Sequence, residues 1–287
     1  MRLIVDSGST KCDWISVDNN GKQLQEKIRT SGLNPEILKE KKLYKIIRKS
    51  EELMKNKEDV THIFFYGAGC GTENPKLLLK RVLEDIFVNA EVEVTEDTMA
   101  AVRATLNDDD EAAIVCILGT GSNCSYYNGT DLEQRVQSLG YTLMDDASGN
   151  YFGKQMVRDY YFKHMPETIR VSFADKHNMD ADYIKYNLYK QPSPNAYLAN
   201  FAEFMFLNID STYIQDMIKD GIRLFAKNMI FQYKDEVEKV PVHFAGSIAF
   251  FAKHQIKEVA EEMGFTAGNF IRRPIEGLVA YHTKKLS

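Results

Sequence analysis

Two short turns in the sequence combine glycine with serine and threonine, the residue types that hold phosphate groups. The first is Asp6-Ser7-Gly8-Ser9-Thr10-Lys11, at the end of the first predicted strand. Gly8 permits a close approach to the backbone, and backbone N–H groups with the Ser9 and Thr10 hydroxyls can bind phosphate oxygens. Asp6 would hold Mg²⁺ through water, because Mg²⁺ keeps much of its hydration shell. An ordinary hairpin turn is the alternative for this motif taken alone.

The second turn is Leu118-Gly119-Thr120-Gly121-Ser122-Asn123, at the equivalent position in the second half of the chain. Two such turns, each ending the first strand of a repeated unit, could face each other across one cleft. Neither matches the GxxxxGK[ST] phosphate loop, and no GxGxxG segment opens a helix as in dinucleotide-binding folds. The paired positions therefore predict a nucleotide phosphate site of another kind.

Acidic residues near predicted helix starts are candidate catalytic groups. Asp97, in Thr95-Glu96-Asp97-Thr98, follows a predicted strand and could accept the proton of a substrate hydroxyl during phosphoryl transfer; alternatively, it only caps a helix. Asp145 and Asp146 could bind sugar hydroxyls or water on Mg²⁺, or could only complement a helix dipole.

A third glycine turn, Ala245-Gly246-Ser247-Ile248-Ala249, joins a predicted buried strand to a helix. Gly246 would let a flat adenine ring approach the backbone, and the helix N-terminus behind it would favour a phosphate. The alternative is a tight turn in which Ser247 caps the helix.

The hydrophobic pattern alternates between short strand-like runs and longer helical periods. The predicted strands are residues 3–5, 14–17, 23–29, 61–66 and 91–95, then 112–118, 122–127, 132–138 and 240–245. The predicted helices are 40–56, 74–88, one from about 97, several up to 235 with breaks around Pro192 and Pro194, 247–263, and one from 275. Each half opens with strand, glycine-rich turn, strand, turn and strand. This order predicts an α/β fold with two mixed sheets flanked by helices.

Composition narrows the functional class. The chain has 287 residues, 44% of them hydrophobic, and a net charge of −5, which gives no general attraction to nucleic acid. Its four cysteines, Cys12, Cys70, Cys116 and Cys124, form no CxxC pair and are expected to be free thiols in a reducing compartment. We expect neither a secretory segment nor a membrane span, and hence a cytoplasmic location.

These motifs, in this order, resemble those of the N-acetylglucosamine kinase group within the BadF/BadG/BcrA/BcrD-type ATPases, part of the actin, hsp70 and sugar-kinase superfamily. Residues 6–11 and 118–124 (LGTGSNC) resemble the two phosphate motifs, 245–249 the adenosine motif, and 139–149 (LGYTLMDDASG) a conserved acidic segment. The resemblance implies two ribonuclease-H-like (actin-like ATPase) domains with an ATP cleft between them. We expect them at 1–108 with a C-terminal helix 273–287, and at 109–272 with a helical insertion, because Gly277-Leu278-Val279-Ala280 resembles the second interdomain connection.

The resemblance also implies an activity: transfer of the γ-phosphate of ATP, with Mg²⁺, to an amino sugar, N-acetylglucosamine at its 6-hydroxyl. Asp97 matches the general base, and Asn34, Asn123 and Asp145 match sugar-binding residues. The residues matched to the ATP phosphates are Asp6, Gly8, Ser9, Thr10, Lys11, Gly119, Thr120 and Gly121, with Gly246 and Ser247 at the adenosine. The pattern departs from the family at Leu139, Met144 and Asp146-Ala147, residues expected to line the sugar pocket.

Two other functions remain open at this point. One is an ATPase that activates an electron-transfer or dehydratase partner through an iron–sulfur cluster, although the cysteines do not follow that pattern. The other is a nucleotide-dependent scaffold without a small-molecule acceptor. The aromatic residues of 151–206, including Tyr160, Tyr161, Phe162, Tyr183 and Tyr186, could form a homodimer interface, but helix core is the favoured interpretation.

Overall fold

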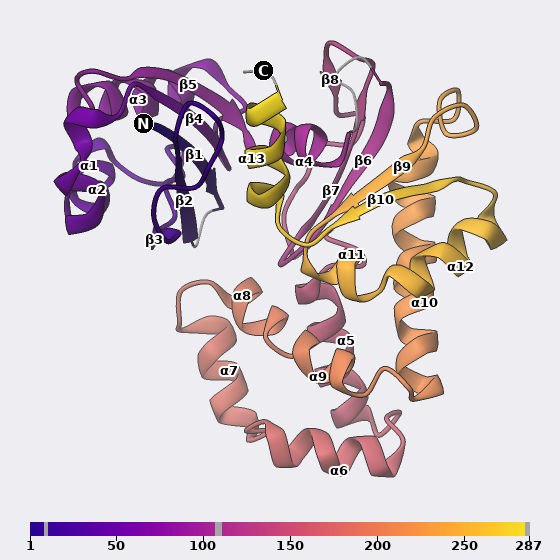
Figure 1. Cartoon of the computed structure of the whole chain (residues 1–287). Coiled ribbons are helices and arrows are strands. Elements are labelled where there is room, and N and C mark those ends of the chain that lie inside the picture. Colours follow the sequence, from indigo (N-terminus) through magenta and orange to yellow (C-terminus); the bar gives the residue numbers. More distant parts are fainter. Residues whose placement is uncertain (9–10, 107–110, 285–287) are drawn as a thin grey trace. The chain divides into compact units, whose positions relative to one another are not determined.

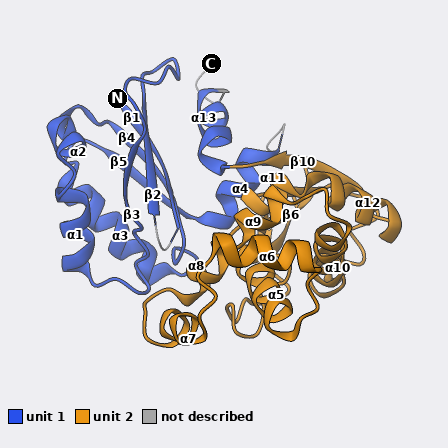
Figure 2. Cartoon of the chain, turned by 90° about the horizontal axis from the view of Figure 1, so that it is seen from below, with its two compact units in different colours: residues 1–106, 273–287 blue, residues 107–272 orange. Residues whose placement is uncertain are grey.

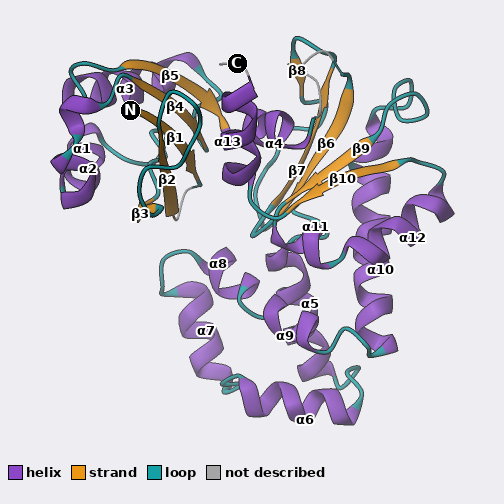
Figure 3. Cartoon of the chain, viewed as in Figure 1, coloured by secondary structure: helices purple, strands orange, loops and turns teal. Residues whose placement is uncertain are grey.

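The computed structural model describes residues 1–8, 11–106 and 111–284 of the chain. Helices and strands alternate along it (Figures 1 and 3). The chain divides into two compact units: unit 1 comprises residues 1–106 and 273–287, and unit 2 comprises residues 107–272 (Figure 2). Each unit contains its own mixed sheet, so the fold predicted from the sequence is confirmed.

The described residues of unit 1 form a five-stranded sheet in the order β3-β2-β1-β4-β5. Strands β1, β2 and β3 form an antiparallel meander, whereas β4 and β5 run parallel to β1. Their bounds are β1 Arg2–Ser7, β2 Lys11–Val17, β3 Ile28–Ser31, β4 His62–Gly67 and β5 Glu91–Glu96.

Helices cover both faces of the unit 1 sheet. Successive side chains of a strand point to opposite faces, and both faces of β1 carry apolar side chains that need cover. Leu3 and Val5 of β1 pack into one core with the apolar faces of α1 and α3, and the intervening Ile4 packs with α4 and α13 (Figure 1). The bounds are α1 Glu40–Arg48, α2 Glu51–Lys55, α3 Glu73–Ile86, α4 Asp97–Thr105 and α13 Pro274–Lys284, with a 3₁₀ turn at Lys57–Asp59.

The described residues of unit 2 repeat this sheet, in the order β10-β9-β6-β7-β8. Again three strands form an antiparallel meander, and two more run parallel to the first of them. Their bounds are β6 Ala113–Leu118, β7 Ser122–Tyr127, β8 Leu132–Glu133, β9 Val242–Ala245 and β10 Ala267–Ile271.

Unit 2 is richer in helix than unit 1. Within this unit, Figure 3 shows α5–α9 gathered beyond one end of the sheet, and α10 and α12 alongside it. The bounds are α5 Gly149–Phe162, α6 Glu167–Lys176, α7 Ala181–Tyr189, α8 Pro194–Ala199, α9 Ala202–Leu207, α10 Thr212–Asn228, α11 Ser247–Phe251 and α12 Lys253–Met263, with a 3₁₀ turn at Ile230–Gln232.

Several predicted elements differ from those of the structure. The strand predicted at 23–29 begins only at Ile28, because Asp18 accepts the backbone N–H groups of Asn20 and Lys22 and forms a turn before it. The helix predicted at 40–56 is interrupted at Ser50, whose side chain caps α2 by accepting from the Leu53 N–H. The helix predicted at 247–263 is likewise divided at Ala252.

Two further differences concern strand β10 and helix α13, the last two elements of the chain. Strand β10 was not predicted at all. Helix α13 begins at Pro274, one residue before the predicted start, and Gly277 lies inside it. A Cβ at Gly277 would lie 2.7 Å from the Cβ of Ala104, which shows why α13 can pack so closely on α4.

The burial of individual side chains tests the expectations for the cysteines and for the aromatic residues of 151–206. All four cysteines, which lie within the described ranges, are buried and free. Tyr161, Phe162, Tyr183 and Tyr186 are 43–59% exposed, so the interpretation of these side chains as helix core was wrong. None of the helices in the described ranges has the length and hydropathy that a bilayer crossing requires.

Candidate active site

The first half of the candidate site lies at one edge of the unit 1 sheet. The register aligns Ser7 of β1 with Gly67 of β4, and Gly67 with Glu96 of β5, so the three parallel strands end level with one another. Asp6 is the penultimate residue of β1, and Asp97 begins α4 directly after β5. The carboxyl ends of parallel strands are where α/β sheets place ligands, so this edge brings both predicted carboxylates to such a position.

Burial and a neighbouring negative charge raise the pKa of both Asp6 and Asp97. Burial, followed by the charge of Asp97, raises the pKa of Asp6 to about 7. Burial, followed by the charge of Glu96, raises the pKa of Asp97 to about 6, even though backbone N–H groups of Thr98 and Asp97 itself partly offset this rise. Both side chains keep partial contact with solvent. A partly accessible carboxylate whose pKa lies near neutrality suits general base catalysis.

The structure places Asp97 one residue inside α4 rather than at its cap position, although its carboxylate accepts backbone N–H groups of the first turn. The cap position of α4 is occupied by Glu96, which makes no side-chain capping bond, and Asp97 is the first residue of the helix.

Asn34 follows β3 and lies at the same edge of the sheet, because its side chain packs against Gly69 in the turn after β4. Its side-chain oxygen accepts from the Glu36 N–H at 3.0 Å, and the preceding Leu33 N–H donates to the Ser7 hydroxyl at 2.9 Å. Gly69 has a positive φ of 76°, and a Cβ there would lie 2.1 Å from Asn34 Oδ1. Only glycine fits this position without displacement. Asn34, Asp6 and Asp97 are therefore held by three segments that meet at this edge.

The first phosphate turn is described only at its two ends. Gly8 follows β1, and among the described residues a Cβ on it would meet only the Lys11 carbonyl oxygen, at 3.9 Å. Lys11 begins β2 opposite Ser31 of β3. Ser9 and Thr10 lie outside the described residues.

The second phosphate turn, between β6 and β7, is held by the start of α5. Within the turn, the Gly119 N–H donates to the Gly121 carbonyl at 2.9 Å. The Gly149 N–H donates to the Gly119 carbonyl at 2.8 Å, and Asn150 donates from its backbone and from Nδ2 to the Thr120 carbonyl at 3.1 and 2.6 Å. Sequence reasoning missed Asn150. The two segments are about 30 residues apart, and only the fold brings them together.

Asp145 contacts the same turn. Its Oδ2 accepts from Asn150 Nδ2 at 2.9 Å, and its Oδ1 accepts from the Ser122 N–H at 3.3 Å. A Cβ at Gly121 would lie 2.8 Å from Asp145 Oδ2, so the glycine makes room for this carboxylate. Asp145 and Ala147 both have positive φ values, 70° and 56°, which side-chain-bearing residues adopt rarely. Asp145 thus orients the turn.

Two further predicted residues, Asp146 and Asn123, also have hydrogen-bonded side chains. Asp146 accepts from Asn228 Nδ2 at 2.8 Å, and the Asn123 side-chain oxygen accepts from the Cys124 N–H at 2.8 Å. A cavity of about 380 Å³ opens beside Asp145 and Asp146, with the mixture of polar and apolar walls that is typical of small-molecule pockets. The residues lining it are Ser122, Val136, Ser138, Leu143, Met144, Asp145, Asp146, Asn228, Met229 and Gln232.

The predicted adenosine turn lies directly against the second phosphate turn. Gly246 has a φ of 110°, and a Cβ on it would lie 2.3 Å from the Leu118 carbonyl oxygen. Both the backbone conformation and the close approach therefore require glycine. The cap of α11 is Gly246, and Ser247 is the first helical residue, so the alternative that Ser247 caps the helix was wrong.

Comparison with solved structures identifies the family of this chain. No family model and no curated protein matches the sequence. Among solved structures, a candidate N-acetylglucosamine kinase from Porphyromonas gingivalis is 31% identical, with complete coverage of both chains and a TM-score of 0.92. This chain belongs to the N-acetylglucosamine kinase family of actin-like ATPases. The family resemblance and the sugar kinase class predicted from the motifs are thereby confirmed.

More distant structures share the fold of this kinase family. A candidate N-acetylglucosamine kinase from Chromobacterium violaceum is 13% identical, with 98% coverage of both chains and a TM-score of 0.73. A ROK family glucokinase from Streptomyces griseus, solved with glucose and AMPPNP, is also 13% identical, with 97% coverage of both chains and a TM-score of 0.57. At these identities the similarity establishes the two-sheet kinase fold alone.

Proposed function

We propose that this sugar kinase transfers the γ-phosphate of ATP to the 6-hydroxyl of N-acetylglucosamine. The observation that carries the proposal is the meeting of Asp6, Asn34 and the partly accessible Asp97 at one edge of the unit 1 sheet. The name of the 31% identical P. gingivalis protein supports an amino sugar as the acceptor.

Asp97 is the general base in this proposal. It accepts the proton of the sugar hydroxyl as the oxygen attacks the γ-phosphorus, and the bond from that phosphorus to the bridging oxygen of ADP breaks. Asn34, Asn123 and Asp145 bind sugar hydroxyls. Because phosphoryl transfer demands mainly positioning and charge stabilisation, residues that fix these groups contribute to catalysis together with the base.

The remaining predicted residues bind the nucleotide. We assign Asp6, Gly8, Ser9, Thr10 and Lys11 of the first turn, and Gly119, Thr120 and Gly121 of the second, to the phosphates. Gly246 and Ser247 are assigned to the adenosine. The packing of Gly246 on Leu118 supports this grouping, because it joins the adenosine turn to the second phosphate turn.

The residues present fit a magnesium ion carried mainly by the nucleotide. Among the described residues there is no group of three or more His, Cys, Asp or Glu side chains that could hold a metal by itself. Asp6, whose pKa is raised by burial and by Asp97, is a carboxylate that a nearby cation would stabilise. Mg²⁺ usually binds through one or two carboxylates, water and substrate phosphates. When bound, it would neutralise phosphate charge, with Asp6 holding it through water.

The direct test is sugar-dependent release of ADP from Mg-ATP by the purified protein, measured against N-acetylglucosamine, N-acetylmannosamine, glucosamine and glucose. We expect N-acetylglucosamine to give the highest kcat/KM and its product to carry phosphate on O6, as identified by ³¹P NMR. Turnover with none of these sugars above the rate without sugar would overturn the proposal.

The raised pKa of Asp97 predicts how the rate depends on pH. Since the base must be ionised, kcat/KM for the sugar should fall about tenfold for each pH unit below roughly 6. An ordinary, unshifted aspartate would hold its activity to about pH 4. The measurement is a direct, uncoupled assay of ADP between pH 4.5 and 8, with circular dichroism at each pH to confirm that the protein is folded. A flat profile down to pH 4.5 would contradict the assignment.

A further inference from the structure

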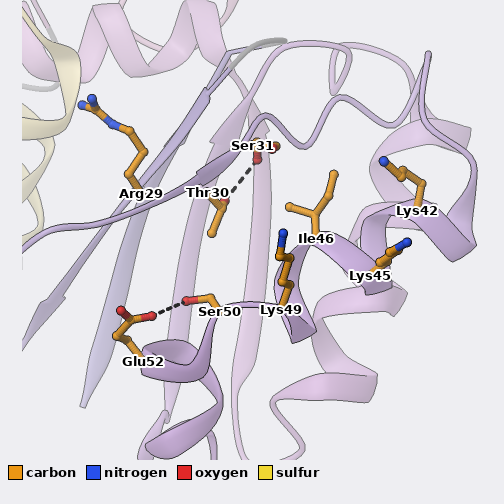
Figure 4. Close-up of a pocket in the computed structure, with 9 residues that line it drawn as sticks. All are labelled: Arg29, Thr30, Ser31, Lys42, Lys45, Ile46, Lys49, Ser50 and Glu52. Carbon is orange, nitrogen blue, oxygen red and sulfur yellow. Dashed lines mark hydrogen bonds between the residues drawn. The ribbon is translucent and has the colours of Figure 1, made fainter.

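Unit 1 contains a cavity that the proposed kinase reaction does not use. It has a volume of about 480 Å³, within the size range of small-molecule pockets, and lies between β3 and the helices α1 and α2 (Figure 4). We call it the basic cavity. The residues lining it are Arg29, Thr30, Ser31, Lys42, Lys45, Ile46, Lys49, Ser50 and Glu52.

The charge of the basic cavity is positive and largely unneutralised. Lys42, Lys45 and Lys49 are spaced three and four residues apart, so they share one face of α1. Within the described part of the chain, none of these three lysines forms an ion pair; the recorded pairs involve other residues. Opposite them, Glu52 is the one carboxylate among the lining residues, and it accepts a hydrogen bond from Ser50.

Arg29 differs from the lysines because its charge is already compensated. It donates from Nε and Nη2 to the Asp13 carboxylate at 2.7 and 3.2 Å. The three lysines are therefore the groups whose charge an incoming anion would meet.

Stabilisation of α1 accounts for only part of this arrangement. Lys45 lies in the last turn of α1 and Lys49 at its C-cap, where positive charge is favourable to the helix dipole. Lys42 lies near the start of the helix, where the dipole disfavours it. Figure 4 shows the Lys49 side chain rising from α1 toward Ser31 of β3, with the Lys42 ammonium turned to the same space. Helix stabilisation does not require lysines to line a cavity.

We propose that the basic cavity binds a small, multiply charged phosphorylated compound. Ammonium groups on flexible stems are suited to the several oxygens of a phosphate. The Ser31 hydroxyl, exposed at the end of β3, is available to a ligand's hydroxyl or phosphate oxygen. The same chemistry is offered by inorganic pyrophosphate and by a sugar phosphate.

The basic cavity adjoins two segments of the candidate active site without containing their predicted residues. Ser31 is opposite Lys11 in the β2–β3 register, and it precedes Asn34 by three positions. The site is therefore separate from the nucleotide turns yet shares a strand pair with one of them.

Isothermal titration calorimetry at constant ionic strength tests the proposal, with pyrophosphate and glucose 6-phosphate as probes. The test variant is Lys42→Gln/Lys49→Gln. The matched control is Lys41→Gln/Lys55→Gln, which removes the same amount of charge at exposed positions of α1 and α2 outside the basic cavity. We expect the wild type to bind at least one probe, the test variant to bind it about tenfold more weakly, and the control to bind as the wild type does.

The outcomes separate the possible sources of binding. Tighter binding of glucose 6-phosphate would identify a sugar phosphate as the ligand class, and tighter binding of pyrophosphate an inorganic one. Absence of binding by the wild type, or an equal loss in the control, would overturn the proposal. Competitive displacement of the probe by AMPPNP would also overturn it, because the probe would then be in the nucleotide site. Since binding is the readout, the result does not depend on the proposed kinase activity.

Discussion

Asp97→Asn is expected to lower sugar-dependent turnover by about a hundredfold to ten-thousandfold, the usual contribution of general acid–base catalysis. The substitution keeps the size of the side chain and removes the proton acceptor. ATP binding should persist, because Asp97 acts on the acceptor sugar in the proposed mechanism. The measurement is ADP release with and without sugar, together with ATP affinity and melting temperature on the same preparation.

The melting temperature should rise by a few degrees in this variant. The folded-state pKa of Asp97 lies above its unfolded value of 3.8, at about 6, so the folded protein binds more protons than the unfolded chain between those values. Its ionised carboxylate therefore destabilises the fold above about pH 6, and asparagine removes that charge. A residue that merely supports the helix start would give the opposite result: lower stability and surviving turnover.

Glu96→Gln is the matched control for Asp97→Asn. Glu96 contributes to the raised pKa of Asp97 but is assigned no role in the reaction. Turnover at neutral pH should be kept, and the acidic limb of the pH profile should move to lower pH. A loss in Glu96→Gln as large as that in Asp97→Asn would show that general disturbance of this edge, rather than loss of the base, explains the effect.

Gly121→Val is expected to weaken ATP binding by at least about tenfold. The added Cβ would lie 2.8 Å from Asp145 Oδ2 and 3.2 Å from its Cγ. The carboxylate would have to move from the Ser122 N–H and from Asn150, which together hold the second phosphate turn. Overpacking of this kind also costs roughly 1–3 kcal/mol of stability. Calorimetric titration with AMPPNP and thermal unfolding measure the two effects.

Gly119→Ala separates nucleotide binding from folding. In the part of the chain that the structure describes, no heavy atom outside its chain neighbours lies within 4 Å of a Cβ at Gly119, so the fold tolerates the methyl group. If phosphates approach this turn, alanine should weaken AMPPNP binding while the melting temperature stays the same. Unchanged affinity in a stable Gly119→Ala protein, with only a loss of stability in Gly121→Val, would reject the nucleotide assignment of the turn.

Sequence patterns predicted the elements whose determinants are local. Strand β4, with its run of buried residues, follows directly from the hydrophobic pattern. The divided helix at Ser50 also had a local signal, a serine three residues before Leu53, that the periodicity of 40–56 concealed.

Elements that depend on distant partners could not be predicted in this way. Strand β8 ends at Glu133 because the Tyr233 hydroxyl, about 100 residues away, bonds the Glu133 carbonyl and the Arg135 N–H in place of a neighbouring strand. Strand β10 contains Gly268 and Asn269, which disfavour strands; its place is fixed by His243 of β9, whose Nδ1 accepts from the Asn269 N–H at 2.7 Å.

In the candidate site, too, the features with local determinants could be predicted and those that depend on distant residues could not. Gly8, Gly119, Gly121 and Gly246 were recognisable as turn glycines from their neighbours alone. The supporting role of Asn150 and the double positive-φ segment at Asp145 and Ala147 depend on packing between segments that the sequence does not place side by side. The raised pKa of Asp97 likewise depends on burial, a property of the folded protein.

Helix α13 has a consequence for how the chain acquires its structure during synthesis. Ile275 and Leu278 of this helix complete the core beneath Ile4 and Ile15, yet all of unit 2 is translated between the two parts of unit 1. At ~5–20 residues per second, that interval is on the order of ten seconds or more. Unit 2 is continuous and can fold as soon as it emerges. Unit 1 must wait with one apolar face of its sheet covered by α4 alone, so nascent chains that stall before Pro274 are the forms of this protein most exposed to chaperones and aggregation.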